Sequence, residues 1–367
     1  MNEDISNKLP ENSDELTGKK NNEIKKKFIR YIIAFALITV ALYITLKDID
    51  FYKLWQYIKN ADYFWVIISI PIMIFSHWVR AMRWQTMLKP VAPKSSVWNL
   101  FSAVMIGYAA NNILPRGGEL LRPYVYARRE KSSYSTAFAT IVVERFIDII
   151  ILALMFGGVF FFFREQIKQA LPNLHAEKFL IPVGIVILVL ILSFWPPFVR
   201  FGLKKIIRPL SQKFYEKLSG IFDRFLLGFT IIRKPGQYLR LTIESLSIWL
   251  LYTIPMYLMF FSFSFDTKYG MGFDDAIFLI VISGIAFTVA PVPGALGIFH
   301  FFIQATLNKV YGINIEEALA YATVNHTVGY LVQTIIGGLF FLRENVKNIE
   351  KNDKEIQKEI IPPPEQN

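Results

Sequence analysis

Residues Ile106–Glu119 read IGYAANNILPRGGE, and residues Ser283–Gly297 read SGIAFTVAPVPGALG. In each stretch an apolar run with the character of a helix breaks at proline and glycine. Each is followed by a helix that is expected to begin at an Ala-Thr pair, Ala139-Thr140 and Ala322-Thr323. A duplicated apolar helix interrupted by Pro and Gly is a pointer to a binding site near the middle of a lipid bilayer. The pattern favours a transporter over a scaffold.

The composition excludes a soluble domain. Hydrophobic residues make up 53% of the 367 residues, 33 of them are Phe, and only 19% are charged. Several apolar runs exceed the roughly 18 residues that span hydrocarbon. The fold class we expect is therefore an all-α, polytopic membrane helix bundle. With no cysteine, the chain cannot form disulfides or thiolate metal sites, and no cofactor is expected.

Nine apolar runs indicate how the chain crosses the membrane. We expect six of them to span and the others to form two re-entrant hairpins, one at Arg116 entering from the cytoplasm and one at Pro291–Gly297 entering from outside. The spans are expected near residues 28–46, 63–84, 137–163, 179–199, 241–265 and 318–342, and the hairpin helices near 97–114, 274–290 and 292–307.

The basic residues set the orientation. In this arrangement the cytoplasmic segments hold 31 of the 40 Lys and Arg, whereas a fully crossing 97–114 would put the basic stretch 200–240 outside. The positive-inside rule rejects that alternative, so both termini are predicted to be cytoplasmic in a multi-pass protein of the cell membrane. We therefore expect the basic residues behind the net charge of +11 to face the membrane surface and not to bind nucleic acid.

The predicted order of spans and hairpins makes two inverted repeats, residues 63–163 and 241–342, within a membrane domain over 28–345. The connector 200–240 has apolar residues at three- and four-residue steps and is expected to lie as an amphipathic helix at the cytoplasmic surface, where it binds head groups or only covers the bundle. Residues 1–27 are expected to be a polar tail, not a signal peptide, and 346–367 a disordered tail.

Six charged residues in or beside the first repeat are expected to form an intramembrane network. Ionisable groups in apolar spans are costly unless they pair or face a cavity. The network would combine Glu144, Arg145 and Asp148 with the hairpin residues Asn112, Pro115, Arg116, Gly117, Gly118, Glu119 and Arg122. One hypothesis is that the guanidinium groups and the backbone N–H groups after Gly118 bind a phosphate-bearing head group. The alternative is that the charges only neutralise one another and hold the hairpin in place.

The second repeat carries histidines where the first carries charges. His300 follows the broken segment with Pro291, Pro293, Gly294 and Gly297, and Asn325-His326 stand in the last span much as Glu144-Arg145 stand in the earlier one. The histidines are candidates for holding a proton that drives transport, or for neutral hydrogen bonding between helices. No third ligand stands at a supportive spacing, so no metal site is predicted.

At these residues the chain resembles the lysylphosphatidylglycerol synthase transmembrane, or flippase-like, family. The matching pieces are the segment 112–119 with Arg122, the segment 144–148 and the segment 291–297, and the resemblance covers roughly residues 28–345. In that family flipping of an aminoacylated lipid is attributed to the membrane half and synthesis to a separate soluble domain. Only 25 residues follow Leu342, so the resemblance implies lipid translocation without aminoacyl transfer.

Three functions are open at this point. The first is a lipid flippase, not an enzyme, that moves an anionic or phosphate-bearing lipid between leaflets, driven by a gradient or by lipid asymmetry because no ATP-binding motif occurs. The second is a lipid-linked glycosyl or head-group transferase that uses Glu119, Glu144 or Asp148 as a base. The third is an accessory subunit of a cell-envelope assembly machine, with a second copy of the chain or an envelope protein as its partner. Divalent-metal dependence would favour the enzyme, and metal-independent lipid exchange the flippase.

Overall fold

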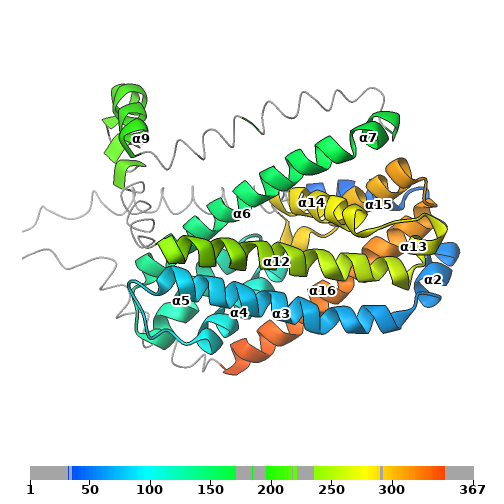
Figure 1. The fold of residues 1–367 in the computed structure, drawn as a ribbon, viewed down its shortest axis with the longest axis horizontal. Coiled ribbons are helices and arrows are strands. Elements are labelled where there is room, and N and C mark those ends of the chain that lie inside the picture. The colour runs from blue at the N-terminus through cyan, green and yellow to red at the C-terminus, as the bar shows by residue number, and fades with distance from the viewer. Residues whose placement is uncertain are drawn as a thin grey trace, which may run out of the picture.

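The computed structural model describes residues 32, 35–170, 184, 196–212, 214–216, 218–220, 235–289 and 292–343, and among these it contains helices and no strands. The predicted all-α bundle is confirmed (Figure 1). Its first set of helices is α3 (Tyr63–Leu88), α4 (Val97–Ile113), α5 (Gly117–Glu130) and α6 (Tyr134–Phe162). Its second set is α12 (Pro235–Ser262), α14 (Phe273–Val289), α15 (Ile298–Tyr311) and α16 (Ile315–Arg343).

The two sets match helix by helix. Their lengths are 26, 17, 14 and 29 residues in the first set and 28, 17, 14 and 29 in the second. The sets also run in opposite directions. The amide of Asp62, before α3, donates to Ser262 O at the end of α12 (2.8 Å), while Arg83 near the end of α3 donates to Ser245 near the start of α12 (3.1 Å). The α4–α5 hairpin therefore enters the bundle from the end opposite to the α14–α15 hairpin, as Figure 1 shows.

The tips of the two hairpins meet inside the bundle. Asn112 at the end of α4 donates to Tyr330 O (3.2 Å) and to Thr334 Oγ1 (2.9 Å), and the Tyr330 hydroxyl donates back to Asn112 O (3.1 Å). Arg116 in the turn after α4 donates to Thr288 O near the end of α14 (3.3 Å). Tyr330 lies about 22 Å along α16, close to its midpoint, at a rise of about 1.5 Å per residue. The breaks in both hairpins therefore lie about halfway along the length of the bundle.

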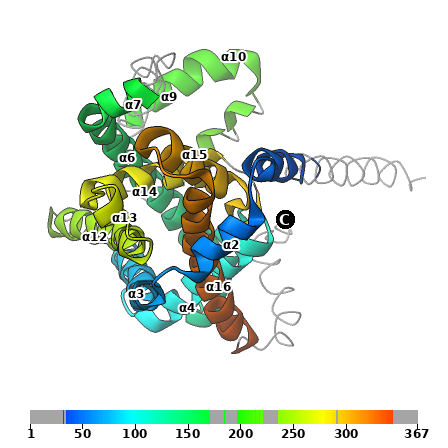
Figure 2. The same cartoon turned by 90° about the vertical axis from the view of Figure 1, so that its right-hand side faces the viewer.

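Helix α16 is at the centre of the bundle. Figure 2 shows it running through the middle of the view, and the residues from Ala318 to Ala322 are all nearly inaccessible to solvent, whereas Leu331, Ile335 and Leu339 in its second half are exposed. Farther along, Gly337 packs directly on the backbone of α4 at Met105. The two carboxylates in the first turn of α16 have partners, since Glu317 pairs with Lys268 (2.7 Å) and Glu316 accepts from the Asp50 amide (3.4 Å).

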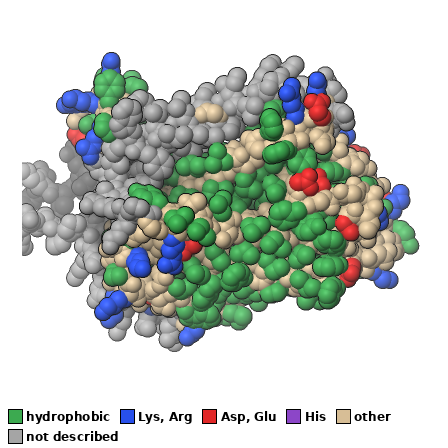
Figure 3. Space-filling model, in the orientation of Figure 1, with side chains coloured by type: hydrophobic (Ala, Val, Ile, Leu, Met, Phe, Trp, Pro, Cys, Tyr) green, Lys and Arg blue, Asp and Glu red, His purple; other side chains and the backbone are tan. Residues whose placement is uncertain are grey.

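Three described helices are long and apolar enough to cross a membrane by length and composition: Tyr63–Leu88, Tyr134–Phe162 and Gly236–Ser262. The segment Phe35–Leu46 is a shorter apolar helix. On the face seen in Figure 3, apolar side chains cover the middle and most charged side chains lie toward the two ends. The count of six spans stays a prediction, since most of 179–199 lies outside the described residues.

Shorter elements connect the helices. They are α2 (Phe51–Lys59), α7 (Arg164–Ala170), α9 (Pro196–Gly202), the π-helical turn Leu203–Ile207, α10 (Arg208–Leu210), α13 (Phe265–Lys268) and the 3-10 turn η2 (Pro293–Ala295). The connector 200–240 is described as helix in part, and its placement at a membrane surface stays a prediction. Both tails, 1–27 and 346–367, and Pro291 lie outside the described residues.

The contact at Gly337 yields a test of the packing. A Cβ there would collide with Met105 O and lie 2.6 Å from the Cβ of Ala109, whereas a Cβ at Gly338 meets nothing within 4 Å. We expect Gly337→Ala to lower the free energy of unfolding by about 1–3 kcal/mol, because α16 and α4 must separate. Gly338→Ala is the matched control, since it adds the same methyl group to the same helix. Thermal unfolding of both variants in detergent measures the difference, and equal melting temperatures would contradict the packing.

Candidate functional site

The site is built around Glu144, a fully buried carboxylate on α6. Guanidinium groups from three helices surround it. The distances to its oxygens are 2.6 Å from Arg80 Nη2, 2.9 Å from Arg122 Nη2, 3.0 Å from Arg145 Nη2 and 3.3 Å from Arg83 Nη2. Glu144 therefore joins α3, α5 and α6 at one point.

Asp148, one turn farther along α6, binds three of the same guanidinium groups. Arg80 Nη2 lies 2.8 Å from its Oδ2, Arg83 Nη1 lies 2.8 Å from its Oδ1, and Arg145 Nη2 lies 3.4 Å from its Oδ2. Four arginines are thus paired with two carboxylates. We call these six residues the charge cluster.

Sequence spacing explains how the charge cluster assembles. Arg80 and Arg83 are three residues apart and so project from one face of α3, while Glu144 and Asp148 are four apart on one face of α6. The two rows face each other, so Arg80 and Arg83 each reach both carboxylates. Tyr108 and Tyr252 complete the shell of Arg80, whose Nη1 donates to their hydroxyls at 2.5 and 3.0 Å.

A close approach of α5 to α4 brings Arg122 into the charge cluster. A Cβ at Gly118 would collide with the carbonyl oxygen of Gly107, so only glycine permits this contact between the two arms of the hairpin. The Arg122 guanidinium then stacks over the Trp84 ring at 4.0 Å from the ring centre, a cation–π contact that fixes its plane. Trp84 is itself fixed by donating to Thr140 Oγ1 at 2.8 Å.

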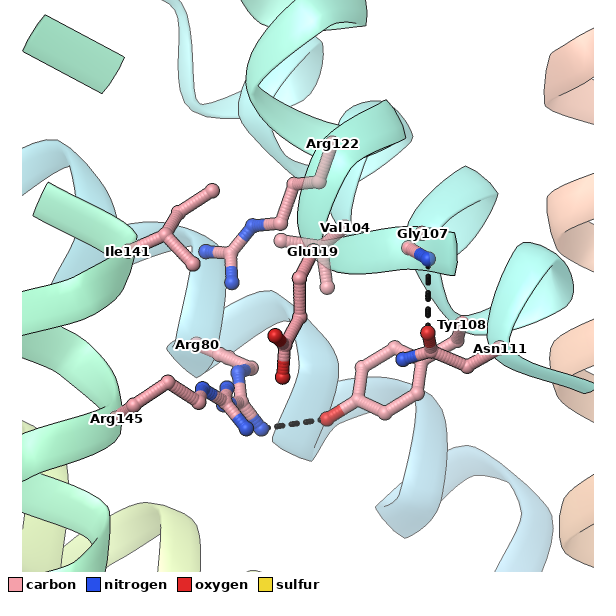
Figure 4. A pocket seen from close by; sticks show the side chains of 10 residues that line it. Arg80, Val104, Gly107, Tyr108, Asn111, Glu119, Arg122, Ile141 and Arg145 are labelled. Carbon is pink, nitrogen blue, oxygen red and sulfur yellow. Dashed lines mark hydrogen bonds between the residues drawn. The ribbon is translucent and has the colours of Figure 1, made fainter. Parts of the chain in front are cut away.

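A pocket of about 40 Å³ opens beside the charge cluster. Figure 4 shows Arg122 and Glu119 extending from α5 and Arg145 extending from α6 toward the same space. Its lining consists of charged and polar residues with a few apolar ones: Arg80, Val104, Gly107, Tyr108, Asn111, Gly118, Glu119, Arg122, Ile141 and Arg145. At about 10–15 Å³ for one water position, it has room for a few waters or one small anionic group.

Two arginines that line this pocket each have a buried donor without a partner. Arg122 Nε and Arg145 Nε are buried without a hydrogen-bond partner. Buried polar groups in folded proteins are normally satisfied, so such atoms point to a missing acceptor. The side chain of Arg145 is also 40% exposed, whereas that of Glu144 is inaccessible. The charge cluster is therefore closed around its carboxylates and open toward the pocket.

Part of the predicted network differs in the structure. The pairing of Glu144 with Arg122 from the hairpin is confirmed, and so is the contact of Arg145 with Asp148. Arg116, in contrast, lies at the hairpin tip beside Pro115, in a left-handed conformation (φ 58°), and binds α14 instead of the charge cluster. Glu119 lines the pocket without an ion pair among the described residues.

The backbone at the start of α5 is also used differently from the prediction. Gly117 N donates to Leu114 O, Gly118 N donates to Asn111 Oδ1 (2.8 Å) and Glu119 N donates to Arg116 O. These amides are therefore not free to bind a phosphate, which leaves the arginine side chains as the donors.

The residues of the second repeat form a separate group at the tip of the other hairpin. His326 Nε2 lies 2.8 Å from Gly294 O, and the rings of His300 and His326 are 4.9 Å apart. Gly294 (φ 55°) and Gly297 (φ 78°) supply left-handed conformations in the turn that begins with Pro293. Asn325 precedes His326 on α16. None of these residues lines the pocket at the charge cluster.

Sequence reasoning missed Arg80 and Arg83. Both lie near the end of the apolar run 63–84, and the count of 31 cytoplasmic Lys and Arg includes them. The available signal was the match between their three-residue spacing and the four-residue spacing of Glu144 and Asp148. Arg83 is fully buried and Arg80 nearly so, which a terminal position in a span does not predict.

Comparison with known proteins identifies relatives of the whole membrane region. The model of the lysylphosphatidylglycerol synthase TM region matches residues 31–337. The UPF0104 membrane protein PH1989 of Pyrococcus horikoshii is 25% identical over 87% of this chain and 97% of that protein. Glycosyltransferase AglD of Haloferax volcanii is 21% identical over 84% of this chain, and the match covers 53% of AglD. No solved structure matches the chain.

Removing the central charge tests how the site is held. We expect Glu144→Gln to lower the free energy of unfolding by about 3–5 kcal/mol, because buried guanidinium groups lose their shared carboxylate. Glu165→Gln, at an exposed position on α7, is the control with the same chemical change. Thermal unfolding in detergent separates the two variants. A melting temperature of Glu144→Gln equal to that of the control would mean that the charge cluster does not hold the three helices.

Proposed function

The chain belongs to the family of the lysylphosphatidylglycerol synthase TM region, and on that premise we propose that it moves a phosphate-bearing lipid between the leaflets of the cytoplasmic membrane. The single observation that carries this proposal is the excess of positive charge at a pocket inside an apolar bundle. Four guanidinium groups meet two carboxylates in the charge cluster, and Glu119 is the one further carboxylate lining the pocket.

An uncompensated charge at membrane depth is expensive, which makes the excess informative. With Glu119 ionised, the charge cluster and the pocket carry one net positive charge. A phosphodiester carries one negative charge and would neutralise it. Arginine suits this role because its planar fork binds phosphate oxygens through paired hydrogen bonds. The guanidinium groups of Arg122 and Arg145, whose residues both line the pocket, are donors of the required kind.

The size of the pocket supports recognition of the phosphate alone. A volume of about 40 Å³ admits one small anionic group and no acyl chains. The chains of the lipid would therefore stay in the bilayer while the head group enters the bundle. This division is what movement of a lipid between leaflets requires, since only the polar part must be shielded from hydrocarbon.

The two hairpins suggest how access alternates. They enter from opposite ends, and the first hairpin contacts the second through Arg116 and Thr288 and contacts α16 through Asn112 and Tyr330. Transporters with inverted repeats expose a midplane site to each side by moving one repeat against the other. With both termini cytoplasmic, as the basic residues predict, the pocket near α5 is closer to the inner leaflet.

A second candidate is a transferase acting on a lipid-linked substrate, which the similarity to Glycosyltransferase AglD favours. That match spans about half of AglD. The glycosyltransferase activity in its name belongs to the whole of that protein and is not assigned to the matched half. In this chain the candidate bases Glu144 and Asp148 are each bound by three or more guanidinium groups, which disfavours a free base. Glu119 is the carboxylate of the pocket that a transferase would use.

Retention of lipid by purified protein tests the proposal. Lipids that co-purify with the wild-type chain and with Arg145→Gln are extracted and quantified by mass spectrometry. We expect an anionic phospholipid to be enriched on the wild type and reduced roughly tenfold on Arg145→Gln, because one charge-assisted hydrogen bond is worth about 1.5–3 kcal/mol. Arg164→Gln, on the exposed helix α7, is the matched control and should retain the lipid.

Movement is measured on the same proteins in vesicles with labelled phosphatidylglycerol as the probe. Exchange between leaflets without added divalent metal supports translocation. Bulk lipid on all three proteins together with no exchange would overturn it. Release of a glycosyl or head-group product from a lipid-linked donor, lost in Glu119→Gln, would establish the transferase instead.

A further inference from the structure

The two repeats place one pair of side chains at equivalent positions. The starts of α5 and α15, Gly117 and Ile298, are separated by 181 residues, and so are the starts of α6 and α16, Tyr134 and Ile315. Applied to both helices, this one offset puts His300 at the position of Glu119 and His326 at the position of Arg145. In the first repeat this pair lines the pocket of the charge cluster. In the second repeat the pair is two imidazoles.

The histidine pair has the geometry of a site with a missing partner. His326 Nε2 donates to Gly294 O (2.8 Å), since a carbonyl can only accept, and this fixes the ring against the hairpin turn. The His300 ring lies 4.9 Å away, and its Nδ1 is buried with no hydrogen-bond partner. Phe299 and Tyr330 pack on the His326 ring at 5.0 and 6.0 Å. The pair is thus enclosed by aromatic rings and a carbonyl.

No carboxylate contacts this pair among the described residues. Phe287 and Thr288 are what α14 presents near it, and the apolar segment Phe35–Leu46 packs on the turn at Gly297. Arg116 donates to Thr288 O near the end of α14, and His77 contacts Gln333, about two turns along α16 from His326.

The other ionisable groups on these helices lie at far ends. On α15 and α16 the remaining charges are Lys309, Glu316 and Glu317, nine or ten residues from the pair, and Arg343, which is farther away. Asp274 and Asp275 lie in the first turn of α14, at the opposite end from Phe287. A charge on the pair is therefore uncompensated by the protein.

Resting on the proposed function, we infer that His300 and His326 form a second phosphate site, which takes the lipid's phosphate group only together with a proton. The neutral pair carries no charge to attract an anion. A protonated pair without an anion is a cation among aromatic rings with no counter-charge, which is costly inside a membrane. The proton gives the pair a positive charge that attracts the phosphate, and the phosphate neutralises that positive charge. The two therefore bind together. The first repeat differs, because its arginines are charged at every physiological pH.

Exchange of labelled phosphatidylglycerol in vesicles at about pH 6 and pH 8, followed by extraction of the outer-leaflet probe with albumin, tests this inference. We expect the wild type to be at least about fivefold faster at pH 6, since histidine titrates in this interval. The decisive variant combines His300→Gln with His326→Arg, which gives the pair one permanent positive charge and no group that titrates near neutral pH. It should exchange lipid at similar rates at both pH values, because its arginine does not titrate. His300→Phe with His326→Phe should be slow at both.

The outcomes separate the two proposals. Exchange by the wild type at equal rates at both pH values overturns the proton-dependent site and leaves the proposed function standing. A pH dependence that persists in the Gln and Arg double variant overturns it as well, since another group would then titrate. Absence of exchange at both pH values overturns the proposed function, and this inference with it. Inhibition by inorganic phosphate at pH 6 but not at pH 8 would identify free phosphate as a ligand of the same site, whereas a lipid-only site is unaffected.

Discussion

The structure depends on one buried carboxylate. Glu144 is inaccessible to solvent and is paired with arginines from α3, α5 and α6. Bringing these charges out of water costs several kcal/mol for each ion, and only their mutual contacts offset it. Such a cluster adds little net stability compared with apolar packing, but displacing any of the three helices would leave buried charges unpaired. It fixes where the first hairpin stops, and hence where its turn lies in the membrane.

The second constraint is the broken backbone at mid-depth. In hydrocarbon, N–H and C=O groups outside a helix must find partners in the protein. Here each hairpin supplies partners for the other half. The amide of Asn112 donates to the carbonyl of Tyr330, and the Tyr330 hydroxyl returns a bond to the carbonyl of Asn112. The left-handed turns at Arg116 and Gly294 bring the chain back on itself. The two repeats therefore satisfy at their contact the groups that each would leave exposed alone.

The sequence was sufficient for the helical class, for the two hairpins and for the pairing of Glu144 with Arg122, because Pro-Gly breaks and charges in apolar runs are local signals. The partners from α3 were missed, since a charge near the end of a span is ordinarily a boundary. The prediction that Arg116 joins the charge cluster was wrong. Its closeness to Glu119 in the sequence does not determine the direction in which its side chain points from the turn. The use of the α5 amides by Asn111 also follows only from the folded turn.

Inverted repeats with identical side chains would face the two sides of the membrane with equal free energy. This chain retains near-equal helix lengths in both halves but changes the chemistry at equivalent positions, with Glu119 and Arg145 in one half and His300 and His326 in the other. In the proposed transport cycle the bundle would alternate between two arrangements, and a ligand can shift such an equilibrium only by its difference in affinity for the two states. Permanent charge in one half and titratable groups in the other would supply that difference and make it depend on the proton.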